Sequence, residues 1–145
     1  MKRHMSLTLL CLALAFGHTA CAPKRLGPTP SGYTFSLQVS DSLIWLESSP
    51  PASTRRYPTS AELIVQVWNA RGEPVDGVPV EFQVDSAWTQ NASVSPQRVM
   101  THDGVARAVF RATTIGVVPV LVRVDQVPQE TAITVSSPAD TGRQT

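Results

Sequence analysis

The chain has 145 residues, a length that fits one domain, and its formal net charge is only +1. Charged residues make up 16% of the sequence, so it lacks the basic surface that nucleic-acid binding usually needs. The 12 prolines and 8 glycines indicate many turns, and no long helical period stands out.

The first 20 residues have the pattern of a secretory signal peptide. Lys2, Arg3 and His4 form a charged start, and an apolar core of about ten residues runs from Leu7 to Phe16. That core is too short to span a bilayer, which needs roughly 20 apolar residues. Residues 1–20 are therefore predicted to be removed, and the rest of the chain is predicted to lie outside the cytoplasm.

The stretch His18-Thr19-Ala20-Cys21 resembles the lipobox of bacterial lipoproteins, although His18 stands where that family usually has Leu. The resemblance implies that Cys21 becomes the diacylated N-terminus and holds the protein on the membrane. In a diderm host, Ala22 after the cysteine resembles the residue found there in lipoproteins that are sorted to the outer membrane. Two other interpretations stay open, namely conventional signal cleavage next to Cys21 and a cysteine that lies there by chance.

Cysteine use and composition divide the rest of the chain. Cys11 leaves with the signal, so only Cys21 remains and no disulfide forms within the domain. Residues 21–32 are rich in Pro and Gly and are predicted to be a flexible tether. Residues 137–145 are predicted to be a disordered tail. The folded domain is predicted to span residues 33–136.

Short segments with every second residue apolar are typical of half-buried strands. They lie at 33–39, 62–67, 78–85, 106–112 and 118–124, and 131–136 is expected to add a last edge piece. These faces are all buried only when two sheets close on each other, which predicts one antiparallel β-sandwich of Ig-type size. Pro119 cannot donate a ladder hydrogen bond, so its strand is expected to be an edge or bulged there.

Three motifs resemble the first group of bacterial Ig-like domains, the repeats of invasin- and intimin-type adhesins. They are NARGEPVDGVPVEF at 69–82, THDGVA at 101–106, and Gly116 followed by alternating valines. Asn69 stands where that family usually has Asp, the connection at 48–60 is longer than usual, and only one copy is present. The resemblance implies an all-β Ig-like fold and a role in adhesion. It marks six residues as fold positions: Asn69, Gly72, Pro74, Gly77, Gly104 and Gly116.

The first of these motifs is predicted to be a structural corner, because its residues have turn chemistry. Asn69 can bond nearby backbone amides, Gly72 supplies a turn conformation, and Pro74 stiffens the start of the next strand. A loop that grips a ligand is the alternative interpretation.

The sequence predicts no enzyme, no cofactor and no metal. His102 is the one histidine after the signal, and no G-x-S-x-G motif accompanies it. A zinc site would need three or four ligands at suitable spacing. Five carboxylates near the expected strand ends could hold Ca²⁺, but no D-x-D-x-D spacing appears. They are Glu73, Asp76, Asp85, Asp103 and Asp125.

The candidate ligand contacts are Trp68, Trp88 and the loop residues Arg55, Arg56 and Tyr57. Exposed aromatic residues stack on sugars or anchor protein interfaces. Alternatively, Trp88 and Trp45 close the ends of the core, and the loop is a solvated tip.

The sequence therefore predicts a monomeric, non-catalytic, lipid-anchored envelope protein. Its expected role is adhesion, envelope interaction or scaffolding, with an envelope protein or a glycan as partner. The alternative is a carbohydrate-binding module that recognises envelope or extracellular polysaccharide.

Overall fold

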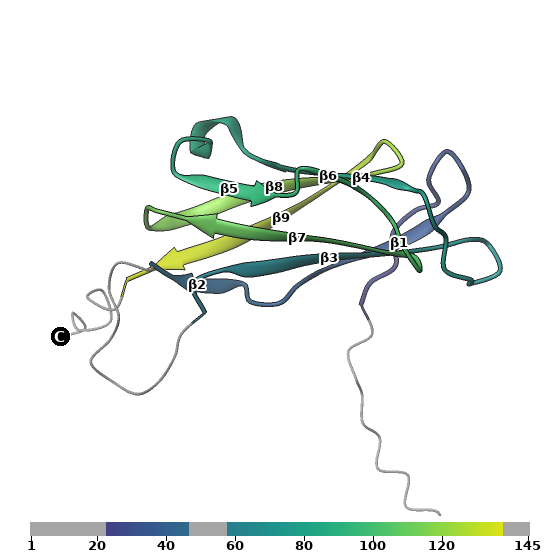
Figure 1. Ribbon diagram of the computed structural model, residues 1–145, viewed down its shortest axis with the longest axis horizontal. Coiled ribbons are helices and arrows are strands. Elements are labelled where there is room, and N and C mark those ends of the chain that lie inside the picture. Colours follow the sequence, from purple (N-terminus) through teal and green to yellow (C-terminus); the bar gives the residue numbers. More distant parts are fainter. Residues whose placement is uncertain (1–22, 47–57, 138–145) are drawn as a thin grey trace, which may run out of the picture.

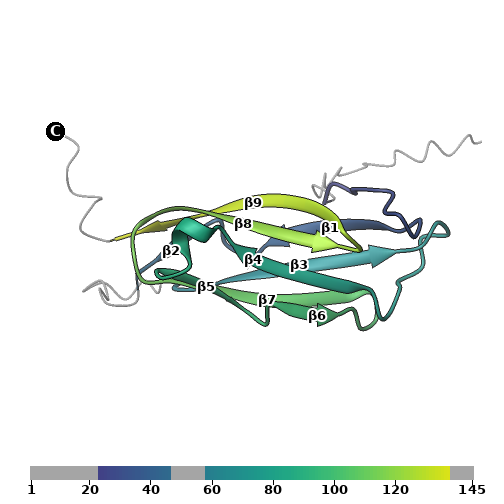
Figure 2. The same cartoon turned by 90° about the horizontal axis from the view of Figure 1, so that it is seen from above.

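The structure, a computed structural model, describes residues 23–46 and 58–137. Figures 1 and 2 show this part of the chain as two β-sheets packed face to face. The strands are β1 (Thr34–Val39), β2 (Leu43–Trp45), β3 (Ala61–Trp68), β4 (Pro79–Val84), β5 (Ala92–Ser95), β6 (Arg98–Met100), β7 (Val105–Ala112), β8 (Gly116–Val124) and β9 (Val127–Ser136), with a 3-10 helix η1 (Ser86–Trp88). Within the described ranges, no helix has the length and apolar character needed to span a bilayer.

The strand order is β1-β3-β7-β5 in one sheet and β2-β9-β8-β4-β6 in the other. The predicted β-sandwich is confirmed, and every pair is antiparallel except β2 with β9. After β1 the chain crosses to the second sheet, where β2 runs parallel to β9. The expected edge piece at 131–136 is wrong in two respects, since β9 begins at Val127 and β2 covers its outer side.

The core forms from the inward faces that the period of two predicts. Alternate residues of β3 and β8 are buried, and three phenylalanines from β1, β4 and β7 fill the space between the sheets. The largest fully buried side chains include Phe35, Leu63, Phe82, Phe110 and Ile133. Burial of such side chains supplies most of the stability of a sandwich that has no disulfide within it.

Pro119 lies inside a sheet, because β9 and β4 flank β8 on its two sides. The expectation of an edge strand is therefore wrong for β8 as a whole. The β4 ladder ends at this position, where the Asp85 N–H donates to the Pro119 carbonyl at 3.1 Å. Proline at 119 has no N–H to donate back to the Asp85 carbonyl. That carbonyl instead accepts from the Trp88 N–H at 2.9 Å, so the missing donor leaves it satisfied.

The folded domain begins at Leu26, seven residues earlier than predicted. The Leu26 N–H donates to the Phe35 carbonyl at 2.7 Å, and the Phe35 N–H donates back at 3.0 Å. Thr29 is buried, and Gly32 donates to its carbonyl at 2.8 Å. The Pro and Gly residues of this segment shape turns against the domain, so the predicted flexible tether is wrong for residues 26–32.

The chain enters the sandwich at one end and leaves it at the other (Figure 1). The end that holds Leu26, the β3–β4 connection and the β8–β9 turn is called the N-terminal pole. The end that holds η1, the β7–β8 turn and the last residue of β9, Ser136, is called the C-terminal pole. The eight residues of β3 that run between the poles span about 26 Å.

Candidate functional site

The segment 69–78 forms a corner at the N-terminal pole. The Asn69 Oδ1 accepts from the backbone N–H of Arg71 at 2.9 Å and from that of Glu73 at 3.0 Å. The Asn69 Nδ2 donates to the Glu73 carboxylate at 2.8 Å. Gly72 has φ 80° and donates its N–H to the Asn69 carbonyl. The side chain of Asn69 thus satisfies two turn amides at once, which is a structural task.

The second motif, 101–104, packs directly on this corner. The buried Thr101 hydroxyl donates to the Val75 carbonyl at 2.6 Å and accepts from the Val78 N–H at 3.0 Å. Gly104 has φ 72°, and a Cβ there would lie 2.6 Å from the Cβ of Pro74. A glycine is needed at 104 for both reasons, because the backbone is left-handed and the proline leaves no room.

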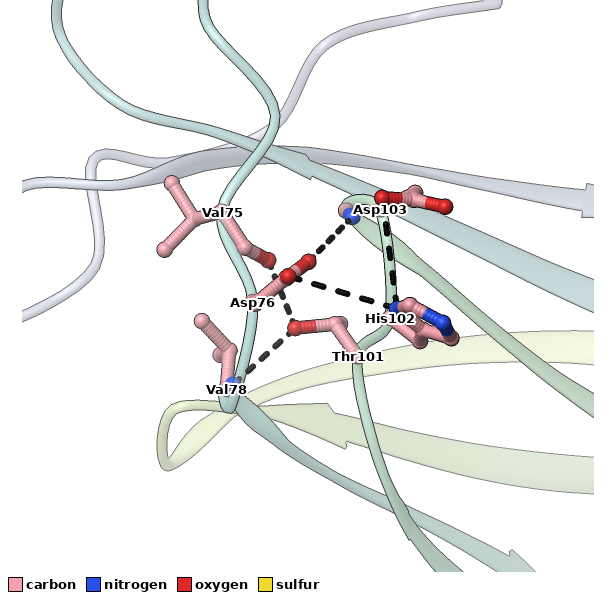
Figure 3. Close-up of polar contacts among 7 residues, drawn as sticks. Val75, Asp76, Val78, Thr101, His102 and Asp103 are labelled. Carbon is pink, nitrogen blue, oxygen red and sulfur yellow. Dashed lines mark hydrogen bonds and ion pairs between the residues drawn. The ribbon is translucent and has the colours of Figure 1, made fainter.

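Asp76, His102 and Asp103 gather on the solvent side of the corner (Figure 3). The His102 Nδ1 lies 4.0 Å from the Asp76 carboxylate and 3.9 Å from that of Asp103. These distances are too long for hydrogen bonds, and all three side chains are exposed, so the contacts contribute little to stability. Asp76 has a structural partner as well, since it accepts from the Gly104 N–H at 3.1 Å. Five carboxylates were considered as calcium ligands. In the described part of the chain, only Asp76 and Asp103 of these five belong to a cluster of possible metal ligands, together with His102.

Residues 26–33 form a strap that holds the β8–β9 turn at the same pole. The Ser31 N–H donates to the Asp125 carboxylate at 3.1 Å. A hydrogen bond from the Thr29 side chain, helped by Ser31 and opposed by slight burial, holds the pKa of Asp125 below its usual value. Asp125 and Gln126 both have positive φ, as a two-residue hairpin turn of the primed type requires.

Trp68 is the last residue of β3 and lies half-buried on the outer face of its sheet, as the strand pattern predicts. The guanidinium carbon of Arg25 sits 4.5 Å from the centre of the Trp68 ring. This cation–π contact covers one face of the ring with a residue of the same chain.

Trp88 lies at the other pole, in η1, and packs against the core. Its ring lies against Gly116, where a Cβ would collide with it. Trp88 therefore closes one end of the sandwich. Trp45 is half-buried in β2, on the face opposite to the buried Ile44, and is not part of the core.

The structure describes two of the five candidate ligand contacts, Trp68 and Trp88, and does not bring these two together. Trp68 and Trp88 lie at opposite poles. Arg55, Arg56 and Tyr57 lie outside the described residues, as does Cys21. Of the described residues next to this gap, Trp45 and Pro58 meet, since the Trp45 N–H donates to the Pro58 carbonyl at 2.8 Å.

A groove of about 390 Å³ lies between the two sheets along β4 and β5. Its floor contains Phe82, Val84 and Val94, and its rim contains Ser93 and Arg98. The sequence did not indicate this groove, because β5 and β6 are too short to show a period.

No protein-family model matches the chain, and no curated protein matches it by sequence. Solved structures do match its fold. Domains D00–D0 of intimin superpose with a TM-score of 0.57 and 14% identity, covering 76% of this chain and 50% of that one. A 282-residue C-terminal intimin fragment was solved with the intimin-binding domain of the translocated intimin receptor. It superposes with a TM-score of 0.51 at 16% identity, covering 69% of this chain and 32% of that one.

Two further solved structures are similar. InvD of Yersinia pseudotuberculosis gives a TM-score of 0.52 at 16% identity, covering 71% of this chain and 28% of that one. Domains 4 and 5 of the S-layer protein SbsC give 0.51 at 11% identity, covering 78% and 53%. This chain spans about half or less of each of these structures. The resemblance to intimin- and invasin-type Ig-like domains is therefore confirmed at the level of the fold.

Proposed function

We propose that this protein is a non-catalytic envelope protein that is anchored to the membrane through lipid on Cys21. In this proposal it displays one Ig-like domain for adhesion, envelope interaction or scaffolding. The similar structures support an extracytoplasmic role of this kind, since they include an intimin fragment bound to its receptor and a surface-layer protein.

One observation carries the proposal, namely the position of Leu26 at the N-terminal pole. Cys21 lies five residues before Leu26, so the connection spans at most about 17 Å when fully extended. A lipid on Cys21 would hold the N-terminal pole close to the bilayer. The C-terminal pole would then point away from the membrane, toward other molecules.

The exposed apolar side chains near the C-terminal pole fit this orientation. Leu43 of β2 and Val117 of β8 flank Thr134 of β9 on the outer face of one sheet, and Ile115 follows in the adjoining turn. The exposed fraction is 44% for Leu43, 57% for Val117 and 47% for Ile115. A protein partner covers such side chains more readily than a sugar does, because sugars prefer flat aromatic platforms.

The proposal is tested by replacing the anchor. In the native host, Cys21→Ser should move the protein from the membrane fraction to the soluble fraction. A matched Ser31→Ala variant keeps the cysteine and should remain with the membrane. Retention of the Cys21→Ser protein on membranes washed with high salt would contradict lipid anchoring.

A further inference from the structure

The outer edge of β5 carries backbone groups that no strand uses. β5 pairs with β7 alone and ends its sheet. The Thr113 N–H donates to the Asn91 carbonyl, which fixes the register, so residues 91, 93 and 95 direct their backbone groups toward β7. Ala92 and Val94 therefore direct their N–H and C=O groups away from the sheet. No hydrogen bond among the described residues uses these four groups.

The opposite wall of the groove has a similar gap. The Phe82 N–H donates to the Gln97 carbonyl at 2.8 Å, which is the last contact between β4 and the β6 segment. The residues before Gln97 belong to the other sheet, because β5 ends at Ser95, which pairs with β7. Val84, two residues further along β4, has no hydrogen-bond partner on that side in the part of the chain that the structure describes, and it lines the groove.

We propose that this groove binds an extended segment of another polypeptide, which adds to β5 as a fifth strand of its sheet. The unpaired groups of Ala92 and Val94 alternate donor and acceptor at strand spacing, and this pattern is complementary to an extended peptide backbone. Every second side chain of the added strand would enter the groove. The volume of about 390 Å³ accommodates small aliphatic side chains next to Phe82 and Val84.

The charges around the groove indicate what the other side chains should be. Arg98 lines the groove and lies 3.8 Å from its one acidic neighbour, Glu81. Arg111 of β7 lies across from the small Ser93 of β5 and is exposed on the outer face. In contrast to Arg107, which pairs with Glu62 at 3.1 Å, Arg111 has no ion pair among the described residues. Glu81 lines the groove too and offsets the charge of Arg98, so the unpaired charge beside β5 is that of Arg111. This positive charge on the outer face favours a strand that alternates aliphatic with acidic residues.

A bare strand fits this groove better than a second copy of the domain. The wall opposite β5 is formed by β4 and the β6 segment, with Arg98 at its edge. A second sandwich that paired through its own β5 would bring a second Arg111 to this edge, and like charges oppose such a pairing. The occupant we infer is therefore an unpaired segment of a partner protein, and this inference does not depend on the lipid anchor.

The test uses the full chain, purified in detergent, and a fluorescent heptapeptide that alternates aspartate and valine. Its binding is followed by fluorescence anisotropy. Val94→Pro removes one edge donor, and proline is tolerated at such a position, so affinity should fall about fivefold. Arg111→Ala should weaken binding about threefold and reduce its salt dependence. Ser93→Ala keeps the edge intact and should bind as the native protein does.

Hydrogen exchange resolved at single amides keeps the test decisive if Val94→Pro does not fold. In the free protein, the amides of Ala92 and Val94 should exchange much faster than those of Ser93 and Ser95. Saturating peptide should slow both fast amides at least tenfold, and a peptide with proline at its centre should not. Three results would overturn the proposal: no slowing, slowing elsewhere only, or slowing that grows with protein concentration without peptide, which would identify a second copy as the occupant.

Discussion

Replacing Gly104 by alanine should cost far more stability than its position in a turn suggests, because Gly104 is buried. The backbone at Gly104 is left-handed, with φ 72°, and this costs an L-residue about 1–2 kcal/mol. A Cβ would also lie 2.6 Å from the Pro74 Cβ and 2.9 Å from the Val67 carbonyl oxygen. Displacing these well-packed neighbours adds about 1–3 kcal/mol. The expected loss is therefore about 2–5 kcal/mol of unfolding free energy.

Gly77 provides the matched control for this substitution. It has nearly the same backbone, with φ 73°, but a Cβ there meets nothing within 4 Å. Gly77→Ala should therefore cost only the conformational term of about 1–2 kcal/mol. Urea unfolding of both variants, followed by circular dichroism, measures the difference directly. Equal losses for the two variants would refute the view that packing of 101–104 on the corner is a structural constraint.

Three other substitutions test separate parts of the structure. Thr101→Ala should cost about 2–4 kcal/mol in thermal unfolding, because it leaves the buried Val78 N–H and the partly buried Val75 carbonyl unpaired, whereas Thr101→Ser should cost about 1 kcal/mol or less. Gly116→Ala should displace the Trp88 ring and change its fluorescence; an unchanged spectrum would contradict the contact. Asp125→Asn should destabilise the protein at neutral pH. Because the folded pKa of Asp125 is lowered, its contribution is complete above the usual aspartate pKa of about 3.9 and is lost as the pH falls through the folded value, so both proteins should converge in acid.

Alternation of side chains predicted the long strands well, because a two-sided sandwich requires it of every half-buried strand. In β3, for example, Leu63, Val65 and Val67 point inward and are fully buried. The shortest strands were beyond this kind of prediction. β2 and β6 have three residues each, and β5 has four, so none contains enough alternation to distinguish it from a loop.

Contacts between distant segments could not be predicted from local pattern. Residues 26–32 look like a linker by composition, but pairing of Leu26 with Phe35 decides their structure. The turn at Asp125 and Gln126 lacks the glycine that usually marks a hairpin, since the strap supplies hydrogen bonds to Asp125. The groove beside β5 depends on the same kind of information, because it lies where two strands end in different sheets.

The most direct test of the proposed orientation is a comparison of two labelled sites on the lipidated protein in vesicles. Arg71→Cys places a fluorophore at the N-terminal pole, and Thr114→Cys places one at the C-terminal pole. Lipids with a quencher on the headgroup should quench the label at position 71 strongly and the label at position 114 little, because β3 alone separates the poles by about 26 Å. Equal quenching at both positions, or stronger quenching at position 114, would contradict a domain held by its N-terminal pole.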